Sequence, residues 1–217
     1  MMADLFDGLA HTNPHQVRLG EGAVLLRGFV EDVADALIVA LEEIIAQASL
    51  RHMVTPGGHR MSVAMTNCGQ VGWVTDCSGY RYDATDPETG RAWPTLPQAF
   101  MDVAKRAAEC AGFHNFLPDA CLINCYVPGA RLSLHQDKNE RDVGAPIVSI
   151  SLGLPAVFLF GGAQRSDRPR RYRLEHGDVA VWGGASRLAF HGIAALADGH
   201  HSVLGAKRFN LTFRKAL

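Results

Sequence analysis

The pattern of apolar and polar positions predicts two helices in the first half of the chain. Within residues 31–48, apolar side chains recur with helical spacing, so one face of this segment is expected to pack on a core. A second helix is predicted from near Pro97, a favoured first-turn residue, to just before Gly112. Residues 1–22 are expected to be irregular, and residues 23–30 to form a first short strand.

A different pattern follows the first predicted helix. Residues 60–68 alternate, with Met61, Val63 and Met65 on one side, as in a half-buried strand. Residues 71–93 contain many turn-forming and aromatic residues, which predicts a loop-dominated surface. The first half of the chain is therefore expected to be mainly helix and loop.

The second half of the chain is a series of short runs rich in β-forming residues, separated by turn sequences such as Pro-Gly and Gly-Gly. No helical run interrupts them, which favours a sandwich or barrel over alternating strand–helix units. No linker or repeat divides the chain, so we expect one α+β domain, 1–217, with a β core over about 118–217. The predicted strands are 120–127, 130–137, 146–153, 156–162, 170–175, 178–184, 186–193 and 207–214.

Composition and charge narrow the class of protein. The 217 residues are 47% hydrophobic and 20% charged, as in a soluble globular domain. A net charge of −1 gives no overall attraction to nucleic acid, so such binding would need a local basic patch. The five cysteines contain no CxxC pair, which favours free thiols in a reducing compartment over a disulfide framework.

The chain shows no targeting or membrane signal. The first ten residues, MMADLFDGLA, have no basic region ahead of an apolar run, so no secretory signal is expected. No apolar stretch approaches the roughly 20 residues that span a bilayer. We expect a cytoplasmic protein without membrane contact, and no feature indicates an obligate protein partner.

The stretch LSLHQDKNE contains two metal-competent side chains, His135 and Asp137, two residues apart. Residues two apart in a strand project from the same face, so both side chains could point at one ion. A third ligand must come from elsewhere, and His191, at the end of a β-like run, is the best candidate. Two histidines and one carboxylate form the facial ligand set of non-haem Fe(II) oxygenases.

Spacing alone does not decide between a metal site and an ordinary pair of surface residues. An isolated histidine-x-aspartate is common and usually binds no metal. His176 and Asp178 share this spacing, but the intervening glycine predicts a tight hairpin turn. His200 and His201 are weaker ligand candidates because they follow Asp-Gly in a polar loop.

The last predicted strand, KRFNLTFR, alternates strictly between an apolar face and a polar face. The polar face carries Arg208, Asn210, Thr212 and Arg214. On an interior strand two arginines need an anionic partner, because unpaired buried charge is costly, and their planar guanidinium groups suit a dicarboxylate. The alternatives are an edge strand with a solvated polar face, or arginines paired with acids of the same chain.

Taken together, these motifs resemble those of the AlkB family of Fe(II)- and 2-oxoglutarate-dependent nucleic-acid dealkylases. The histidine-x-aspartate pair, His191 and RxNxTxR follow in the family's order, and NCYVPGARLSLHQDKNE and PIVSISLGLPAVF extend the similarity over nearly the whole chain. Residues 53–73 match the stretch that forms the family's nucleotide-recognition lid. The resemblance implies a double-stranded β-helix, or jelly roll, supported by N-terminal helices, with a lid at about 51–93.

The resemblance also implies roles for individual residues. His135, Asp137 and His191 would hold Fe(II). The co-substrate 2-oxoglutarate would be bound by Asn124, Tyr126, Arg208, Asn210 and Arg214.

The implied reaction is oxidative demethylation of N-alkylated bases of the N1-methyladenine and N3-methylcytosine type. O2 and 2-oxoglutarate would be consumed, giving succinate and CO2, and the methyl group would leave as formaldehyde. This is direct-reversal repair of alkylated single- or double-stranded DNA, with RNA as a further substrate class.

Substrate recognition is expected to use aromatic side chains, because an alkylated base must be unpaired or flipped out before it can react. Trp73 would stack on one face of the base, and the family resemblance implies that His135 covers the other face. Tyr80 and Tyr82 match positions that touch the nucleotide backbone in the family. The alternative for all three aromatic residues is ordinary packing.

Two positions depart from the family pattern. Asn139, which would face the base, stands where many family members carry an acid, and Glu140 could compensate for the missing charge. His59 stands where close relatives carry a lid tyrosine. Both departures bear on base preference rather than on the type of reaction.

Residues 163–173 carry five arginines against one acid, a local run that predicts phosphate contacts on a nearly neutral protein. Arg165 matches a nucleic-acid contact of the family, although charged runs are more often simply solvated. Two other functions remain open from the sequence: a dioxygenase that acts on a protein or small molecule, and a jelly-roll binding module without catalysis.

Overall fold

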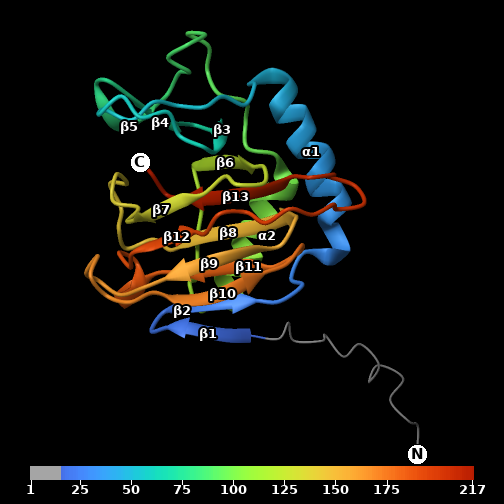
Figure 1. The fold of residues 1–217 in the computed structure, drawn as a ribbon, viewed down its shortest axis with the longest axis vertical. Helices are drawn as coiled ribbons and strands as arrows, with labels where there is room; N and C mark the ends of the chain where they lie inside the picture. The colour runs from blue at the N-terminus through green and yellow to red at the C-terminus, as the bar shows by residue number, and fades with distance from the viewer. Residues whose placement is uncertain (1–15) are drawn as a thin grey trace, which may run out of the picture.

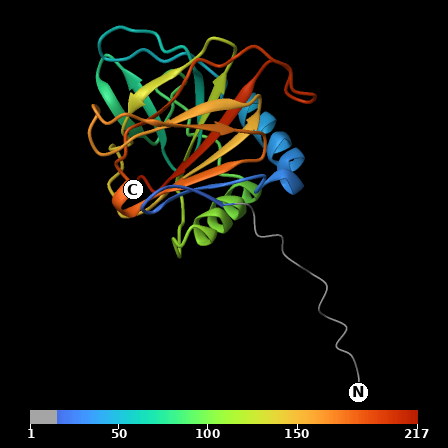
Figure 2. The same cartoon turned by 60° about the horizontal axis from the view of Figure 1, so that its bottom comes forward.

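The computed structural model describes residues 16–217 (Figure 1). Residues 1–15, which include the stretch in which no secretory signal is expected, lie outside the described residues. Two antiparallel β-sheets lie face to face, and the two α-helices cover the outer face of the larger sheet (Figure 1, Figure 2). This arrangement is the double-stranded β-helix expected from the sequence.

The two main sheets contain eleven strands of the described chain. The larger sheet has the order β1-β2-β11-β8-β13-β6-β3, and the smaller has the order β10-β9-β12-β7. The strands of the larger sheet are β1 (Gln16–Gly20), β2 (Ala23–Leu26), β3 (Ala64–Gly69), β6 (Ala120–Tyr126), β8 (Ile147–Gly153), β11 (Val179–Trp182) and β13 (Arg208–Arg214). Those of the smaller sheet are β7 (Leu132–His135), β9 (Ala156–Phe160), β10 (Arg170–Leu174) and β12 (His191–Ile193).

Helix α1 (Ala34–Gln47) forms where the apolar periodicity predicts it, and helix α2 (Gln98–Cys110) lies between Pro97 and Gly112, as their start and stop signals predict. Each helix buries one face in a core that it shares with the outward side chains of the larger sheet. Pro97 caps the start of α2, one residue before the first turn in which it was expected. The two 3-10 helices are η1 (Glu31–Val33), directly before α1, and η2 (Gly184–Ser186).

Strand β13 occupies an interior position between β8 and β6, so the edge-strand alternative is wrong. Its apolar side chains join the core beneath the helices. Its polar side chains point into the space between the two sheets, where a second core of apolar and aromatic residues surrounds them. All four are buried: Arg208, Asn210, Thr212 and Arg214.

The first half of the chain contains more strand than predicted. Residues 16–20 form β1, where irregular structure was expected. The expected loop surface at 71–93 contains a hairpin of β4 (Gly72–Asp76) and β5 (Gly79–Asp83), which pair only with each other (Figure 1). Each strand has only five residues, and the glycines and aspartates at their ends favoured a loop in the sequence.

Two further predictions about the second half are corrected by the structure. The strand predicted at 130–137 ends at His135, so Asp137 lies in the irregular segment that follows β7. The turn at 176–178 is not a hairpin, because it joins β10 to β11 in the other sheet. The Asp178 carboxylate stabilises this crossing by accepting bonds from Arg27 and from main-chain N–H groups.

No helix within residues 16–217 is both long enough and apolar enough to cross a bilayer.

Candidate active site

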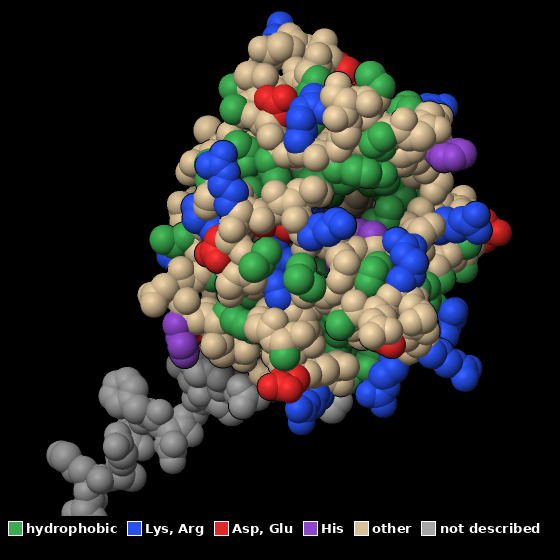
Figure 3. All heavy atoms as spheres, turned by 90° about the vertical axis from the view of Figure 1, so that its left-hand side faces the viewer, with side chains coloured by type: hydrophobic (Ala, Val, Ile, Leu, Met, Phe, Trp, Pro, Cys, Tyr) green, Lys and Arg blue, Asp and Glu red, His purple; other side chains and the backbone are tan. Residues whose placement is uncertain are grey.

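A cavity of about 950 Å³ opens between the two sheets and is lined by both sheets and by the β4–β5 hairpin. Figure 3 shows a hollow on this face of the molecule, with a histidine side chain visible inside it and Lys and Arg side chains on several sides. The cavity contains the polar face of β13 and the predicted metal ligands.

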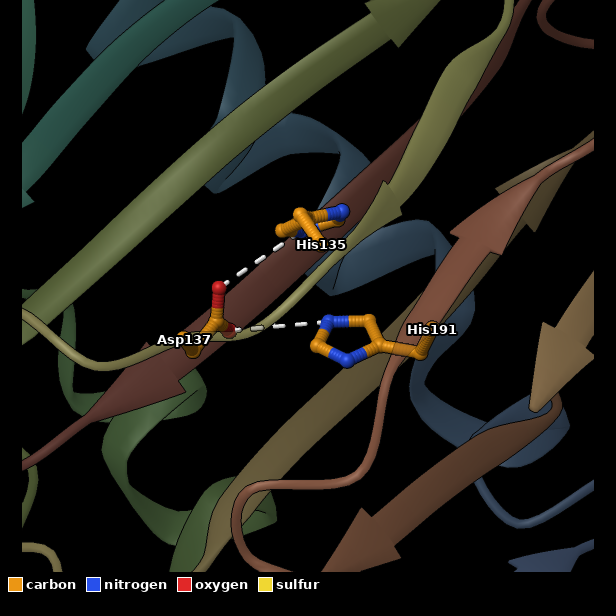
Figure 4. Close-up of side chains that lie close together, drawn as sticks. All are labelled: His135, Asp137 and His191. Atoms are coloured by element: carbon orange, nitrogen blue, oxygen red, sulfur yellow. Dashed lines mark ion pairs between the residues drawn. The ribbon is translucent and has the colours of Figure 1, made fainter. Parts of the chain in front are cut away.

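The structure brings His135, Asp137 and His191 together at the floor of this cavity (Figure 4). His135 ends β7 and His191 begins β12, and the two residues are direct partners in the antiparallel pairing. Nε2 of His135 lies 3.6 Å from Oδ1 of Asp137, and Nε2 of His191 lies 3.8 Å from Oδ2. Within residues 16–217 this is the one group of three such side chains close enough to hold a single ion.

Hydrogen bonds to main-chain carbonyls orient both imidazole rings. Nδ1 of His135 lies 2.9 Å from the Ser133 carbonyl oxygen, and Nδ1 of His191 lies 3.0 Å from the Ala189 carbonyl oxygen. Each Nδ1–H donates to its carbonyl, which leaves the Nε2 lone pair free and directed toward Asp137. Both rings are therefore set in the tautomer that a metal requires.

Burial and neighbouring charges shift the pKa values of His191 and Asp137. Burial and the nearby His135 lower the pKa of His191 to about 4, so this ring is neutral at pH 7. Burial alone would raise the pKa of Asp137, but the Arg214 guanidinium and the two histidines lower it well below its usual range. Arg214 donates two hydrogen bonds to Oδ2, at 3.0 and 2.6 Å.

Arg208 is a buried cation that faces the cavity without an acidic partner. Its Nη2–H donates to Ser151 Oγ at 3.1 Å and its guanidinium lies 5.0 Å from the Tyr126 ring centroid, but Nε and Nη1 have no hydrogen-bond partner. The Oδ1 atom of Asn124, which lines the same cavity, is also unpaired. Every other buried Asp, Glu or Arg side chain in the described chain lies within 4 Å of an opposite charge.

The two arginines of β13 therefore differ. Arg214 is paired with Asp137, and its Nε lies 3.4 Å from Oε1 of Glu140. For this residue the alternative expected from the sequence, an arginine paired with acids of the same chain, is correct. Arg208 has no such pairing, so it is the arginine of β13 that needs an anionic ligand to balance its charge. Asn210 lies between them and donates to Ser149 Oγ and the Ile150 carbonyl.

The hairpin places two aromatic rings at the cavity wall. Trp73, on β4, is partly buried and stacks on Tyr80 with ring centroids 5.7 Å apart. Its Nε1–H donates to Oδ1 of Asn139 at 3.2 Å, and Tyr80 is 48% exposed. Tyr82 instead donates its hydroxyl to Oε1 of Glu140 at 2.6 Å, and burial raises the pKa of this hydroxyl.

The arginines of the basic run are all exposed, and Arg165 lines the cavity with its guanidinium 5.1 Å from the Phe190 ring centroid. Arg173 pairs with Glu175. His59 also lines the cavity, whereas His176, His200 and His201 lie outside the metal group.

Sequence reasoning did not identify Arg187 or Ser151 as part of the site. Arg187 is buried and donates to the main-chain carbonyl of Asp137 at 2.7 Å and to Glu140. Ser151 holds the Arg208 guanidinium. Neither residue stands out in the sequence, because an arginine in a turn and a serine in a strand are ordinarily solvated.

Comparison with known proteins agrees with this geometry. The profile of the 2OG-Fe(II) oxygenase superfamily matches residues 22–214. The alpha-ketoglutarate-dependent dioxygenase AlkB of Escherichia coli (strain K12) is 55% identical over 215 residues, which cover 99% of this chain and 98% of that protein. The chain belongs to the AlkB family.

Other comparisons support the same assignment. An AlkB homolog from Caulobacter vibrioides is 45% identical over 182 residues, covering 83% of this chain and 81% of the relative. The solved structure of OsALKBH1 superposes with a TM-score of 0.79 at 30% identity, covering 93% of this chain and all of that one. AlkB-family proteins of this superfamily are dioxygenases that use Fe(II), 2-oxoglutarate and O2, so the cofactor prediction is confirmed and the non-catalytic alternative is set aside.

Proposed function

We propose that this protein oxidatively removes methyl groups from N-alkylated bases of the N1-methyladenine and N3-methylcytosine type in DNA. O2 and 2-oxoglutarate are consumed, and succinate, CO2 and formaldehyde are released. One observation carries the proposal: the His135–Asp137–His191 group shares a cavity with an aromatic hairpin wall on one side and the unpaired Arg208 on the other.

The metal-binding role belongs to His135, Asp137 and His191. Two imidazoles and one carboxylate suit Fe(II) and leave coordination positions open. When bound together with 2-oxoglutarate, the iron supplies the activation of O2 that the oxidation of an N-methyl group requires. The chain itself contributes the orientation of the ligands and the exclusion of water.

The co-substrate site is built around β13 and β6. The unpaired Nε–H and Nη1–H groups of Arg208 would bind the carboxylate of 2-oxoglutarate that lies farther from the metal, with Tyr126 and Asn124 alongside. Arg214, which already contacts Asp137, would lie near the carboxylate next to the metal, and Asn210 would complete the polar wall. A dicarboxylate fits this wall because it compensates a buried cation that nothing else in the described chain compensates.

The base would enter between Trp73 and His135. An aromatic platform contributes about 1–3 kcal/mol per stacked base, and an indole further favours a base that methylation has made cationic. Asn139 would face the edge of the base while it holds the Trp73 indole N–H. Of the two hairpin tyrosines, Tyr80 has the more accessible side chain for a backbone phosphate, because the Tyr82 hydroxyl is bonded to Glu140.

Arg165 and the exposed arginines after it would bind phosphates beside the cavity. Single-stranded DNA is the first substrate to test, because the base need not be flipped out of a duplex, and duplex DNA and RNA are the comparisons. A cytoplasmic location is part of the proposal, since all five cysteines are free, as in a reducing compartment.

The deciding experiment is anaerobic reconstitution with Fe(II) and 2-oxoglutarate, followed by O2 and a single-stranded oligonucleotide with one N1-methyladenine. We expect loss of one methyl group by mass and an equal amount of formaldehyde. Omission of 2-oxoglutarate and the variant His135→Ala are the controls. If no methylated DNA or RNA is changed while a peptide or metabolite stimulates succinate formation, the protein acts on another substrate class.

A further inference from the structure

Two hydrogen bonds join the β4–β5 hairpin to the segment that carries Asp137. Trp73 Nε1–H donates to Asn139 at 3.2 Å, and the Tyr82 hydroxyl donates to Glu140 at 2.6 Å. Asn139 and Glu140 follow Asp137 by two and three residues, in a segment that belongs to no strand. The position of the Asp137 carboxylate therefore depends on side-chain contacts, because no strand pairing holds it.

Glu140 lies at the centre of the contacts that hold Asp137. Its side chain is 1% exposed, its Oε2 accepts from Arg187 Nη2 at 3.1 Å, and its Oε1 lies 3.4 Å from Arg214 Nε. Arg214 donates to the Asp137 carboxylate, and Arg187 donates to the Asp137 main-chain carbonyl. Both arginines that hold Asp137 are thus themselves held by Glu140.

We propose that Glu140 is a positioning residue that couples the base-binding hairpin to the metal group. Tyr82 orients the Glu140 carboxylate, Glu140 fixes Arg187 and Arg214, and these arginines fix Asp137. A nucleotide that holds the hairpin in one position raises the affinity for the metal. By linkage, a bound metal raises the affinity for the nucleotide by the same factor. This inference rests on the proposed function for the ligands at its two ends.

The Tyr82 hydroxyl distinguishes coupling from simple charge neutralisation. Asp137 and Glu140 already balance the charges of Arg187 and Arg214, so neutralisation does not require Tyr82. Its hydroxyl is nevertheless directed at the one Glu140 oxygen that also faces Arg214. Tyr82→Phe removes this bond while it retains the ring and every charge in the network.

The test measures Mn(II) affinity without oxygen in the full-length protein, since Mn(II) occupies such N and O ligands without redox chemistry. Compared with wild type, we expect Tyr82→Phe to bind Mn(II) about tenfold more weakly, in the range seen when partners of metal ligands are removed. Tyr172→Phe is the matched control. It also removes one tyrosine hydroxyl, but that hydroxyl contacts the Leu19 carbonyl on β1, at 3.5 Å, and not the Glu140 network. Equal Mn(II) affinity of Tyr82→Phe and wild type would overturn the proposal.

A second measurement tests whether Tyr82 acts through Glu140. We expect the double variant Tyr82→Phe/Glu140→Gln to lose no more Mn(II) affinity than Glu140→Gln alone, whereas additive losses would contradict this path. A saturating N1-methyladenine oligonucleotide should raise the Mn(II) affinity of wild type about fivefold or more, and that of Tyr82→Phe by less. An equal rise in both proteins counts against coupling.

These results are separable from those of the activity assay. Thermal unfolding without metal shows whether each variant is folded. If Glu140→Gln is unstable, the Mn(II) affinity of Tyr82→Phe still tests the proposal. The Mn(II) affinities of the free proteins need no substrate. Loss of the proposed function would appear as absent formaldehyde in wild type, while failure of the coupling would appear as unchanged metal affinity in a protein that still releases formaldehyde.

Discussion

At the scale of single residues, Arg208 differs from the other buried charged residues because two of its guanidinium nitrogens have no hydrogen-bond partner. Burial lowers the pKa of its guanidinium, but the group remains charged at any physiological pH. A folded protein keeps such a cation only where a ligand or function compensates for it. Replacing Arg208 by an apolar residue should therefore weaken 2-oxoglutarate binding without lowering the stability of the unloaded protein.

We predict that Arg208→Leu raises the KM for 2-oxoglutarate about a hundredfold, because two charge-assisted hydrogen bonds worth about 3 kcal/mol in total are lost. The unloaded variant should unfold at the same temperature as wild type or higher, because an unpaired buried charge is removed. Thermal unfolding with and without 2-oxoglutarate and Mn(II) measures both effects. Arg106→Leu, on the solvent-facing side of α2, is the control. A strongly destabilised unloaded Arg208→Leu protein would contradict this prediction.

Asn139 is the second residue-scale test. Asn139→Asp keeps the acceptor for the Trp73 indole N–H and adds a negative charge beside the base. We expect kcat/KM on cationic methylated bases to rise about fivefold, since a half-exposed charge pair contributes about 1 kcal/mol, and the ratio between N1-methyladenine and N3-methylcytosine to change. Kinetics identical to wild type on both bases would remove Asn139 from recognition.

At the scale of elements, the metal group depends on how closely β12 approaches β7. A Cβ atom added to Gly192, the middle residue of β12, would lie 2.5 Å from the Leu132 carbonyl oxygen. Only glycine permits the two strands to pair at this distance. The pairing in turn places His191 opposite His135.

We therefore predict that Gly192→Ala destabilises the protein by about 1–3 kcal/mol and weakens Mn(II) binding at least tenfold, since β12 must shift away from β7. Gly57→Ala is the control, because its added Cβ would meet His59 at an ordinary 3.7 Å. Chemical denaturation and metal titration measure the two effects. A Gly192→Ala protein with wild-type metal affinity would show that the close approach is not required.

At the scale of the whole molecule, charge is distributed unevenly although the net charge is only −1. Exposed arginines gather on β10 and the segment before it, next to the cavity mouth, while a buried cluster of acids and arginines lies beneath the hairpin. The exposed group should govern long-range attraction of nucleic acid, and the buried group should govern how stability depends on pH.

Arg165→Glu should weaken binding of all single-stranded DNA sequences to a similar extent. Each lost phosphate contact should reduce the slope of log K against log salt concentration by about 0.7. Fluorescence anisotropy at several salt concentrations measures this slope. A loss of affinity confined to methylated oligonucleotides would instead place Arg165 in base recognition.

The pH dependence of metal-free stability follows from His191. Its folded-state pKa of about 4 lies below the ordinary 6.5, so the unfolded chain takes up the proton first as the pH falls. Up to about 3 kcal/mol of the unfolding free energy should be lost between about pH 6.5 and pH 4. Asp137, whose pKa is also lowered, should add a further loss below that range. In His191→Asn, urea denaturation should show a flatter curve above pH 4.

The sequence by itself determined the two helices, the strand-rich second half and the alternation of β13, and the family resemblance carried by its motifs added the jelly roll and the His135, Asp137 and His191 group that the structure brings together. These features depend on periodicity and on motif order, which are local properties of the chain. The structure places Asp137 beside the two histidines, but the reason given from the sequence was wrong, because Asp137 lies beyond the strand that was expected to orient it.

Only the tertiary structure decided which charges are paired and which are not. Arg208 and Arg214 look equivalent in RFNLTFR, but folding brings Asp137 and Glu140 to one and no acid to the other. The same holds for Arg187 and for the Tyr82–Glu140 contact between a hairpin and a segment 58 residues away. Pairing and burial depend on distances between segments far apart in the chain, and a single sequence does not encode those distances in any local pattern.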